Sequence, residues 1–265
     1  MRPEYLDLTA GQVAVAAALI AINAAISLAL KLGMERRLLV ASVRTVAQLS
    51  LIGLVLEWVF RVRSWPVVVA LATVMAAVAG FAAVKRVSRR YPGIWLNSVV
   101  SIWASSWIVA GLAVGGVVRV DPWWEPQYAI PLLGMILGNT LNGISLGLDR
   151  LTEELVVRRD RVETLLALGA TRWEAARDSV RAAVRTGMIP IVNSMMVVGI
   201  VSIPGMMTGQ LLAGVDPRSA VEYQIVIMFL IASGTALGTV GVVLLGYRRL
   251  FNRRHQFLSH SIRSV

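Results

Sequence analysis

Residues 65–84 read WPVVVALATVMAAVAGFAAV and contain no charged side chain. A helix rises 1.5 Å per residue and the hydrocarbon core of a bilayer is about 30 Å thick, so about 20 mostly apolar residues span it. This stretch therefore predicts a transmembrane helix. The whole chain has the matching composition, with 57% hydrophobic and 15% charged residues among its 265 positions. In soluble domains about 45–50% of the residues are apolar and about 25% are charged.

Six further apolar runs have the same character, some with polar interruptions. We expect an all-α fold, a polytopic membrane helical bundle that forms a single domain over residues 1–265. The seven predicted spans are Thr9–Leu30, Leu38–Phe60, Trp65–Val84, Ile94–Val118, Tyr128–Leu148, Met188–Ala213 and Tyr223–Gly246.

The basic residues predict how the chain is oriented. If the N-terminus lies outside, 20 of the 26 Lys and Arg residues fall in inner segments and five fall in outer ones, Arg2 included. Cytoplasmic connections carry such an excess of Lys and Arg. We therefore expect an N-out, C-in, multi-pass protein of a bacterial cytoplasmic (inner) membrane. The net charge of +11 belongs to these connections, so we expect membrane lipid as a partner and not nucleic acid.

Several kinds of site are excluded by the residues present. A phosphate-binding loop needs Gly-Lys-Ser/Thr, and the two lysines, Lys31 and Lys85, are followed by Leu and Arg. Both histidines, His255 and His260, fall in the predicted cytoplasmic tail, and there is no cysteine. The last apolar run has no lysine for a retinal Schiff base. We expect a chain that is not an enzyme and binds no cofactor itself.

The longest predicted cytoplasmic connection, residues 149–187, has the pattern helix–glycine–helix. Gly169 suits a left-handed helix C-terminus, and Thr171 with Glu174 three residues later is a capping box for a second helix. This predicts a docking element for a cytoplasmic partner, or alternatively a helix pair lying on the membrane surface. The predicted docking residues are Glu163, Leu166, Gly169, Ala170, Thr171, Arg172, Trp173, Glu174 and Arg177.

Polar residues at membrane depth are candidates for a translocation path, with hydrogen bonding between helices as the alternative. Pro204-Gly205 should break the sixth helix and expose backbone carbonyls. Two GxxxG pairs, Gly134/Gly138 and Gly143/Gly147, predict that the fifth helix is central. The path candidates are Asn139, Asn142, Ser145, Asn193, Ser194, Pro204 and Gly205.

Methionines cluster on the same sixth helix and offer a weak metal site. Thioether sulfurs are soft ligands that suit Cu(I) better than iron, while adaptable packing is the alternative role. The candidates are Met195, Met196, Met206 and Met207.

These motifs resemble those of two groups of known membrane proteins. Glu163 with Gly169-Ala170 resembles the EAA loop by which ABC-transporter permeases dock on their ATPase, although Thr164-Leu165 replaces Ala-Ala and the terminal Leu-Pro is missing. The wider chain resembles the FetB-like permease family, membrane subunits of a bacterial iron-export ABC system with plant relatives linked to aluminium tolerance. The stretches that carry this resemblance are 44–49 (RTVAQL), 56–60 (LEWVF), 138–142 (GNTLN) and 187–210.

The family resemblance implies a homodimer of this subunit with two copies of a separate ABC ATPase, which binds the ATP and Mg²⁺. It also implies export of iron or another metal ion. A lipid or sugar-nucleotide cargo would keep the same architecture. A self-sufficient secondary transporter or receptor is the rival class, and such transporters usually keep ionisable groups at mid-membrane.

Overall fold

The computed structural model describes residues 9–119, 121–252 and 254–264. These residues are almost entirely helical, and six of their helices are long and apolar enough to cross a membrane. The prediction of a polytopic helical membrane protein is therefore confirmed. The count of seven spans, the orientation and the single domain stay predictions. Arg2 and Arg253, both counted for the orientation, lie outside the described residues.

The chain divides into two compact units. Within the first, α1 (Ala10–Ala29) begins at a capping box of Thr9 and Gln12, and α2 (Glu35–Val62) ends at Arg63 in the left-handed conformation. Ser27 ties the two helices, because its hydroxyl donates to Glu35 Oε2 at 3.0 Å and accepts from the Met34 amide at 3.0 Å.

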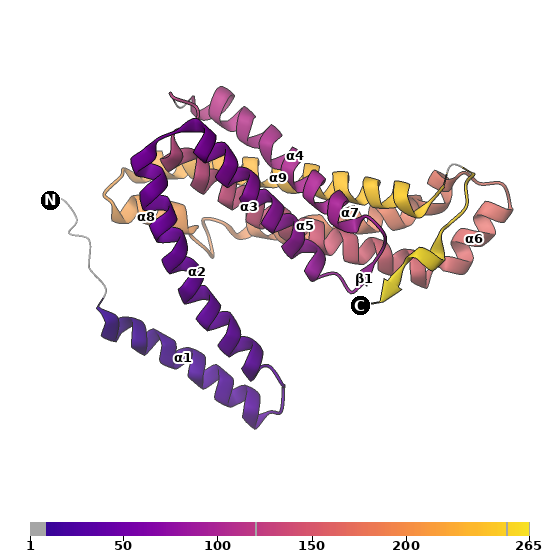
Figure 1. Cartoon of the computed structure of the whole chain (residues 1–265), viewed down its shortest axis with the longest axis horizontal. Helices are drawn as coiled ribbons and strands as arrows, with labels where there is room; N and C mark the ends of the chain where they lie inside the picture. The colour runs from indigo at the N-terminus through magenta and orange to yellow at the C-terminus, as the bar shows by residue number, and fades with distance from the viewer. Residues whose placement is uncertain (1–8, 120, 253, 265) are drawn as a thin grey trace. The chain divides into compact units, whose positions relative to one another are not determined.

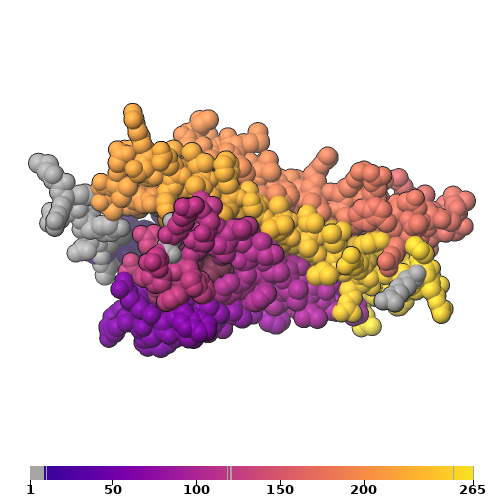
Figure 2. All heavy atoms as spheres, turned by 90° about the horizontal axis from the view of Figure 1, so that it is seen from above, coloured from indigo at the N-terminus to yellow at the C-terminus, as the bar shows by residue number. Residues whose placement is uncertain are grey.

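The second unit, Ser64–Leu211 with Asp216–Val265, contains the remaining helices. Figure 1 shows α5, α7 and α9 running alongside one another, and in Figure 2 the yellow α9 lies between the magenta α4 and the salmon α7. The fifth helix is central as predicted, because α5 packs against α3, α4, α7 and α9. The elements are α3 (Trp65–Lys85), β1 (Arg89–Arg90), α4 (Ile94–Leu112), a π-helical turn η1 (Ala113–Val118), α5 (Pro126–Val157), α6 (Arg159–Ala167), α7 (Arg172–Val197), α8 (Gly205–Leu212), α9 (Pro217–Leu250), the 3₁₀ turn η2 (Ser259–Ser261) and β2 (Arg263–Ser264).

Glycines set the spacing of the three central helices. A methyl group on Gly187 of α7 would lie 2.6 Å from the backbone oxygen of Gly143 on α5 and 2.6 Å from Cγ2 of Thr239 on α9. Real side-chain carbons do not approach other atoms that closely, so the backbones of α5 and α7 touch here because neither residue has a side chain. Small residues allow such close approach in membrane bundles. Of the two GxxxG pairs in α5, Gly143/Gly147 makes this contact.

The three predicted inner connections that belong to this unit meet at one end of it. Val87, Leu151, Val162, Ala176 and Phe251 are buried in one apolar cluster there. Strand β1 from the α3–α4 connection pairs antiparallel with β2 at the C-terminal end of the chain. The meeting of these segments agrees with the Lys/Arg distribution, which places all of them on the same side of the membrane.

The predicted sixth span, Met188–Ala213, is not one continuous helix. Helix α7 ends at Val197 and α8 begins at Gly205. The expected break at Pro204-Gly205 is therefore present, but it starts earlier, at Val198, whose backbone is extended and is followed by Gly199 at φ +82°. The predicted connection 149–187 also differs, because α5 continues to Val157 and α7 already begins at Arg172.

Replacing Gly143 by Ala should lower the thermal unfolding midpoint of the detergent-solubilised protein. The new methyl would lie 2.6 Å from Thr239 Oγ1 and 3.1 Å from the Gly187 oxygen, and such overpacking costs about 1–3 kcal/mol. Gly138→Ala is the matched control on the same helix, since no atom lies within 4 Å of its added methyl. Equal midpoints for the two variants would contradict the proposed helix contact.

Candidate functional site

The turn between α6 and α7 is a well-defined helix terminus. Gly169 has φ +89°, and its amide donates to the Leu166 oxygen while the Ala170 amide donates to the Leu165 oxygen, at 3.1 and 3.0 Å. This pair of bonds is the Schellman motif that ends many helices in glycine. The helix–glycine–helix prediction is confirmed, and the turn has a fixed geometry.

Helix α7 begins with the predicted capping box. The Glu174 amide donates to Thr171 Oγ1, and Glu174 Oε2 accepts from the Thr171 amide at 2.7 Å and from its hydroxyl at 2.8 Å. These donors favour the charged carboxylate, the backbone amide most of all, and hold the pKa of Glu174 below its usual value. Two ion pairs add to the element: Arg159–Glu163 within α6 at 2.7 Å and Arg161–Asp178 between α6 and α7 at 3.0 Å.

The C-terminal tail closes over the start of α7. The Arg172 amide donates to His255 Nδ1 at 2.8 Å, so the tail satisfies an amide at the helix N-terminus, where the first amides have no partner within the helix. Trp173 packs edge-on against Tyr247, with ring centroids 5.5 Å apart. Tyr247 in turn contacts Phe251, which stacks on Phe257. The predicted docking element is therefore braced by α9 and the tail, through contacts that no local sequence pattern predicts.

Most predicted docking residues are exposed on this element, but not all. Leu166 is half-buried and packs against the apolar cluster of the cytoplasmic end. Leu168 continues the apolar spacing of Val162 and Leu165, which predicts a place on the apolar face, but it is 79% exposed. Its position one residue before Gly169 turns it outward, so it joins Trp173 as an apolar side chain available to a partner. The exposed predicted residues are Glu163, Gly169, Thr171, Trp173, Glu174 and Arg177, and the half-buried ones are Leu166, Ala170 and Arg172.

A cavity of about 260 Å³ lies where α5, α7, α8 and α9 meet beside the break in α7. It brings together five of the predicted path and metal residues, which come from three helices and the connection between α7 and α8. These are Asn139, Ser194, Pro204, Gly205 and Met206. The sequence did not single out the other seven lining residues, which include Met135, Gln224 and Met228.

The polar groups of this cavity are neutral. Gln224 is 6% exposed, and its Oε1 has no hydrogen-bond partner among the described residues. A second cavity of about 190 Å³ shares Met135 and Met206 with the first and is lined by Gln210, whose Oε1 is likewise buried without a partner. Buried amide oxygens normally have partners. Each of the two cavities therefore holds a neutral amide oxygen that could accept from a hydrogen-bond donor or contact a cation.

The other predicted path and metal residues lie elsewhere. Asn142 and Ser145 line a separate cavity with Arg86, whose Nη1 donates to Asn142 Oδ1 at 2.7 Å. Asn193 is exposed on α7 and lines none of these cavities. Of the four predicted methionines, Met195 and Met206 pack against one apolar cluster, Met207 is half-buried and Met196 is 73% exposed. Among the described residues, no group of three or more His, Asp or Glu side chains could hold a metal ion.

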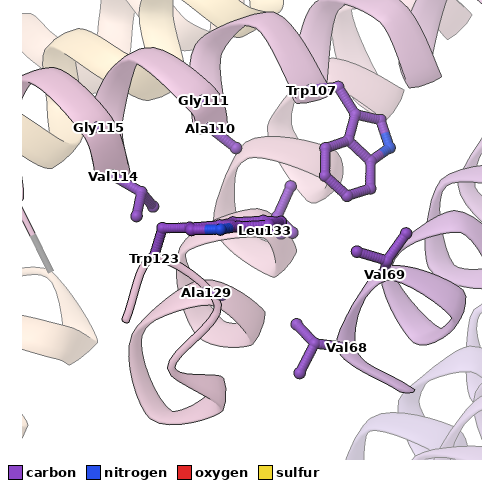
Figure 3. Close-up of a pocket in the computed structure, with 10 residues that line it drawn as sticks. All are labelled: Val68, Val69, Trp107, Ala110, Gly111, Val114, Gly115, Trp123, Ala129 and Leu133. Carbon is purple, nitrogen blue, oxygen red and sulfur yellow. The ribbon is translucent and has the colours of Figure 1, made fainter. Parts of the chain in front are cut away.

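A further cavity, of about 480 Å³, lies between α3, α4 and α5. Figure 3 shows Trp107 and Trp123 at this cavity with Val68, Val69 and Leu133. No charged side chain is among its ten lining residues. It has no polar side chain beyond the tryptophan rings to recognise a solute, and we do not consider it part of the path.

Comparison with known proteins places this architecture among membrane proteins of one kind. The model of the uncharacterised protein family UPF0014 matches residues 10–251. A UPF0014 membrane protein of Synechocystis is 42% identical over 86% of this chain and 88% of its own. The probable iron export permease protein FetB of Escherichia coli is 31% identical over 95% and 96%, respectively. The ALUMINUM SENSITIVE 3 protein of Arabidopsis thaliana is 31% identical over 94% and 91%. These similarities confirm the resemblance inferred from the sequence. No solved structure matches the chain.

Replacing His255 by Ala should speed amide hydrogen exchange in the first turn of α7. The change removes the acceptor of the Arg172 amide, and a hydrogen bond worth about 1 kcal/mol corresponds to about five-fold faster exchange. His260→Ala removes the other, exposed histidine of the tail and should leave exchange in α7 unchanged. The same acceleration in both variants would mean that the tail does not cap α7.

Proposed function

The chain belongs to the UPF0014 family of membrane proteins, and from this premise we propose that it is the permease subunit of an ATP-driven transporter whose ATPase is a separate protein. One observation carries the proposal. Helix α7 begins at the capped α6–α7 turn, on the predicted cytoplasmic side, and ends at the cavity beside Gly199. A single helix thus joins a rigid exposed element to a buried polar site.

The energy for transport comes from outside this subunit in our proposal. The sequence has no phosphate-binding loop, so the chain itself binds no ATP or Mg²⁺ and is not an enzyme. The partner ATPase docks on the exposed face of Glu163–Arg177, with Leu168 and Trp173 as apolar anchors. By resemblance, the assembly contains two copies of this subunit and two of the ATPase.

The cargo we propose is iron or another metal ion, moved outward. This rests on the similarity to the Escherichia coli relative, a probable iron export permease. The cavity agrees with a cation cargo, because uncharged oxygen and sulfur atoms bind a cation weakly. A transport site must bind weakly enough to release its cargo. Its lining has no Asp, Glu, Lys, Arg or His, which argues against an ion-coupled secondary transporter, where ionisable groups are usual. A lipid or sugar-nucleotide cargo would fit such a small cavity poorly.

Changes at the turn should weaken docking without disturbing the membrane helices. Gly169→Val places a β-branched residue at φ +89°, a strain of about 1–2 kcal/mol that should lower ATPase affinity about 5- to 30-fold. Gly169→Asn is the matched control, because Asn tolerates the left-handed region. Affinity can be measured by co-purification of the tagged permease with its ATPase.

Leu168→Asp tests the exposed anchor in the same assay. It should reduce ATPase co-purification and uncouple ATP hydrolysis from transport while the unfolding midpoint stays unchanged, because Leu168 is 79% exposed. Val157→Asp, at a side chain 73% exposed at the end of α5, is the control outside the docking segment. Normal binding by both Gly169→Val and Leu168→Asp would show that the partner docks elsewhere.

Removing an amide from the cavity should slow metal efflux from proteoliposomes that contain the permease and its ATPase. Gln224→Leu and Asn139→Leu each remove one, and losing a hydrogen bond to a charged or strongly polar cargo should slow transport about ten-fold. ATPase co-purification should not change. Asn193→Leu removes the same group from the exposed surface of α7. Slower efflux only in Asn193→Leu would place the route on that surface instead of in the cavity.

A further inference from the structure

A basic groove of about 780 Å³ lies between the predicted cytoplasmic end of α5 and the first half of α7. Arg150 lines it from α5, and Arg181, Arg185 and Thr186 line it from α7. Arg181 and Arg185 are four residues apart, so their side chains share one face of the helix. Three guanidinium groups from two helices therefore converge on one hollow.

Two of these charges are uncompensated. Arg150 is paired with Glu153 and Glu154 of its own helix. Asp178, the acidic residue in the lining, is paired with Arg161 of α6 at 3.0 Å. Neither Arg181 nor Arg185 has an ion pair with a carboxylate in the part of the chain that the structure describes. Like charges at this spacing repel each other, so an anion bound between them would relieve the repulsion.

The predicted span ends place the groove at the level of the inner lipid headgroups. The predicted spans end at Leu148 and begin at Met188, so Arg150 and Arg185 lie directly beyond them. Thirteen residues, about 20 Å of helix, separate Arg185 from the docking turn at Arg172. This distance favours an anion at the membrane surface over the acidic surface of a docked protein.

The membrane side of the groove offers an apolar surface. Next along the same pair of helices is a cavity lined by Leu146 and Pro190, and also by the polar side chains of Arg86, Asn142 and Ser145. Leu146 is 39% exposed, and Ile189 and Val192 near Pro190 are 48% and 44% exposed. Pro190 has no amide hydrogen, so the Thr186 carbonyl is left without its helical donor. The arginines, the free Thr186 carbonyl and the exposed apolar side chains therefore follow one another along the helices. This order matches the charged phosphate, the polar glycerol region and the acyl chains of a phospholipid.

We propose that this groove binds an anionic phospholipid, with the lipid phosphate held by Arg181 and Arg185 and supported by Arg150. Arginine suits this role because its planar guanidinium donates two parallel hydrogen bonds to phosphate oxygens. The acyl chains pack along Leu146 and the α7 surface beyond Pro190. Since the lipid would touch both α5 and α7 beside their contact at Gly143 and Gly187, its binding would favour one arrangement of these helices. The proposal does not depend on the cargo or on the ATPase.

The test is lipid binding by the full-length purified protein, titrated with phosphatidylglycerol or phosphatidylcholine and followed by native mass spectrometry. The variant is Arg181→Gln with Arg185→Gln, two exposed positions where glutamine preserves the helix. Each arginine near an anionic lipid surface contributes about five-fold to binding, so the double variant should lose about 25-fold in phosphatidylglycerol affinity. Phosphatidylcholine binding should not change.

Two matched variants and one competitor complete the experiment. Arg248→Gln with Arg254→Gln removes the same charge from exposed residues outside the groove and should bind phosphatidylglycerol normally. Arg181→Lys with Arg185→Lys keeps the charge and should retain most of the affinity.

Equal losses in the two glutamine pairs would overturn the site in favour of general charge attraction. Displacement of the lipid by millimolar inorganic phosphate would instead assign the groove to a soluble phosphate. Unchanged lipid binding with lost ATPase binding would assign it to the protein partner.

Discussion

Contact between the backbones of α5 and α7 is possible because Gly143 and Gly187 both lack a side chain. The position of Thr239 against the same point brings α9 into the contact. Each candidate site lies on one side of this contact. The cavity of Asn139 and Gln224 is on the side of the α7 break, and the basic groove and the docking turn are on the other. A change in the spacing between α5 and α7 at this contact would therefore move the cavity, the basic groove and the α6–α7 turn together.

The parts that the sequence predicted correctly are those with local signals. Apolar runs give the membrane helices, and Thr171 with Glu174 gives the start of α7, because a capping box involves residues three apart. Gly169 marks the end of α6 for a similar local reason. Gly199 carried the same signal as Gly169, but it was overlooked inside a long apolar run beside the more conspicuous Pro204. The break in the predicted sixth span was consequently placed too far along the chain, at Pro204-Gly205.

The contacts that the sequence could not predict join distant residues. Arg172 and His255 are 83 positions apart, and nothing in either neighbourhood indicates that the tail reaches α7. The cavity could not be predicted for the same reason. Met135, Gln224 and Met228 have no local signal in their apolar helices, and only the packing of α8 brings them to one cavity. Apolar periodicity also misplaced Leu168. It has the spacing of a core residue, but the turn at Gly169 carries it away from the core and exposes it.

The geometry of α7 makes it a lever with its pivot near Gly187. About 22 Å of helix separates Arg172 from the pivot and about 15 Å separates the pivot from Val197. A sideways displacement of the docked end would reach the cavity reversed in direction and reduced to about two-thirds. Pro190, three residues past the pivot, weakens the stiffness of the shorter arm by removing a helical hydrogen bond. In the proposed transporter, the displacement that reaches the cavity would thus be smaller than the displacement applied at the cytoplasmic end of α7, and it would be transmitted less stiffly.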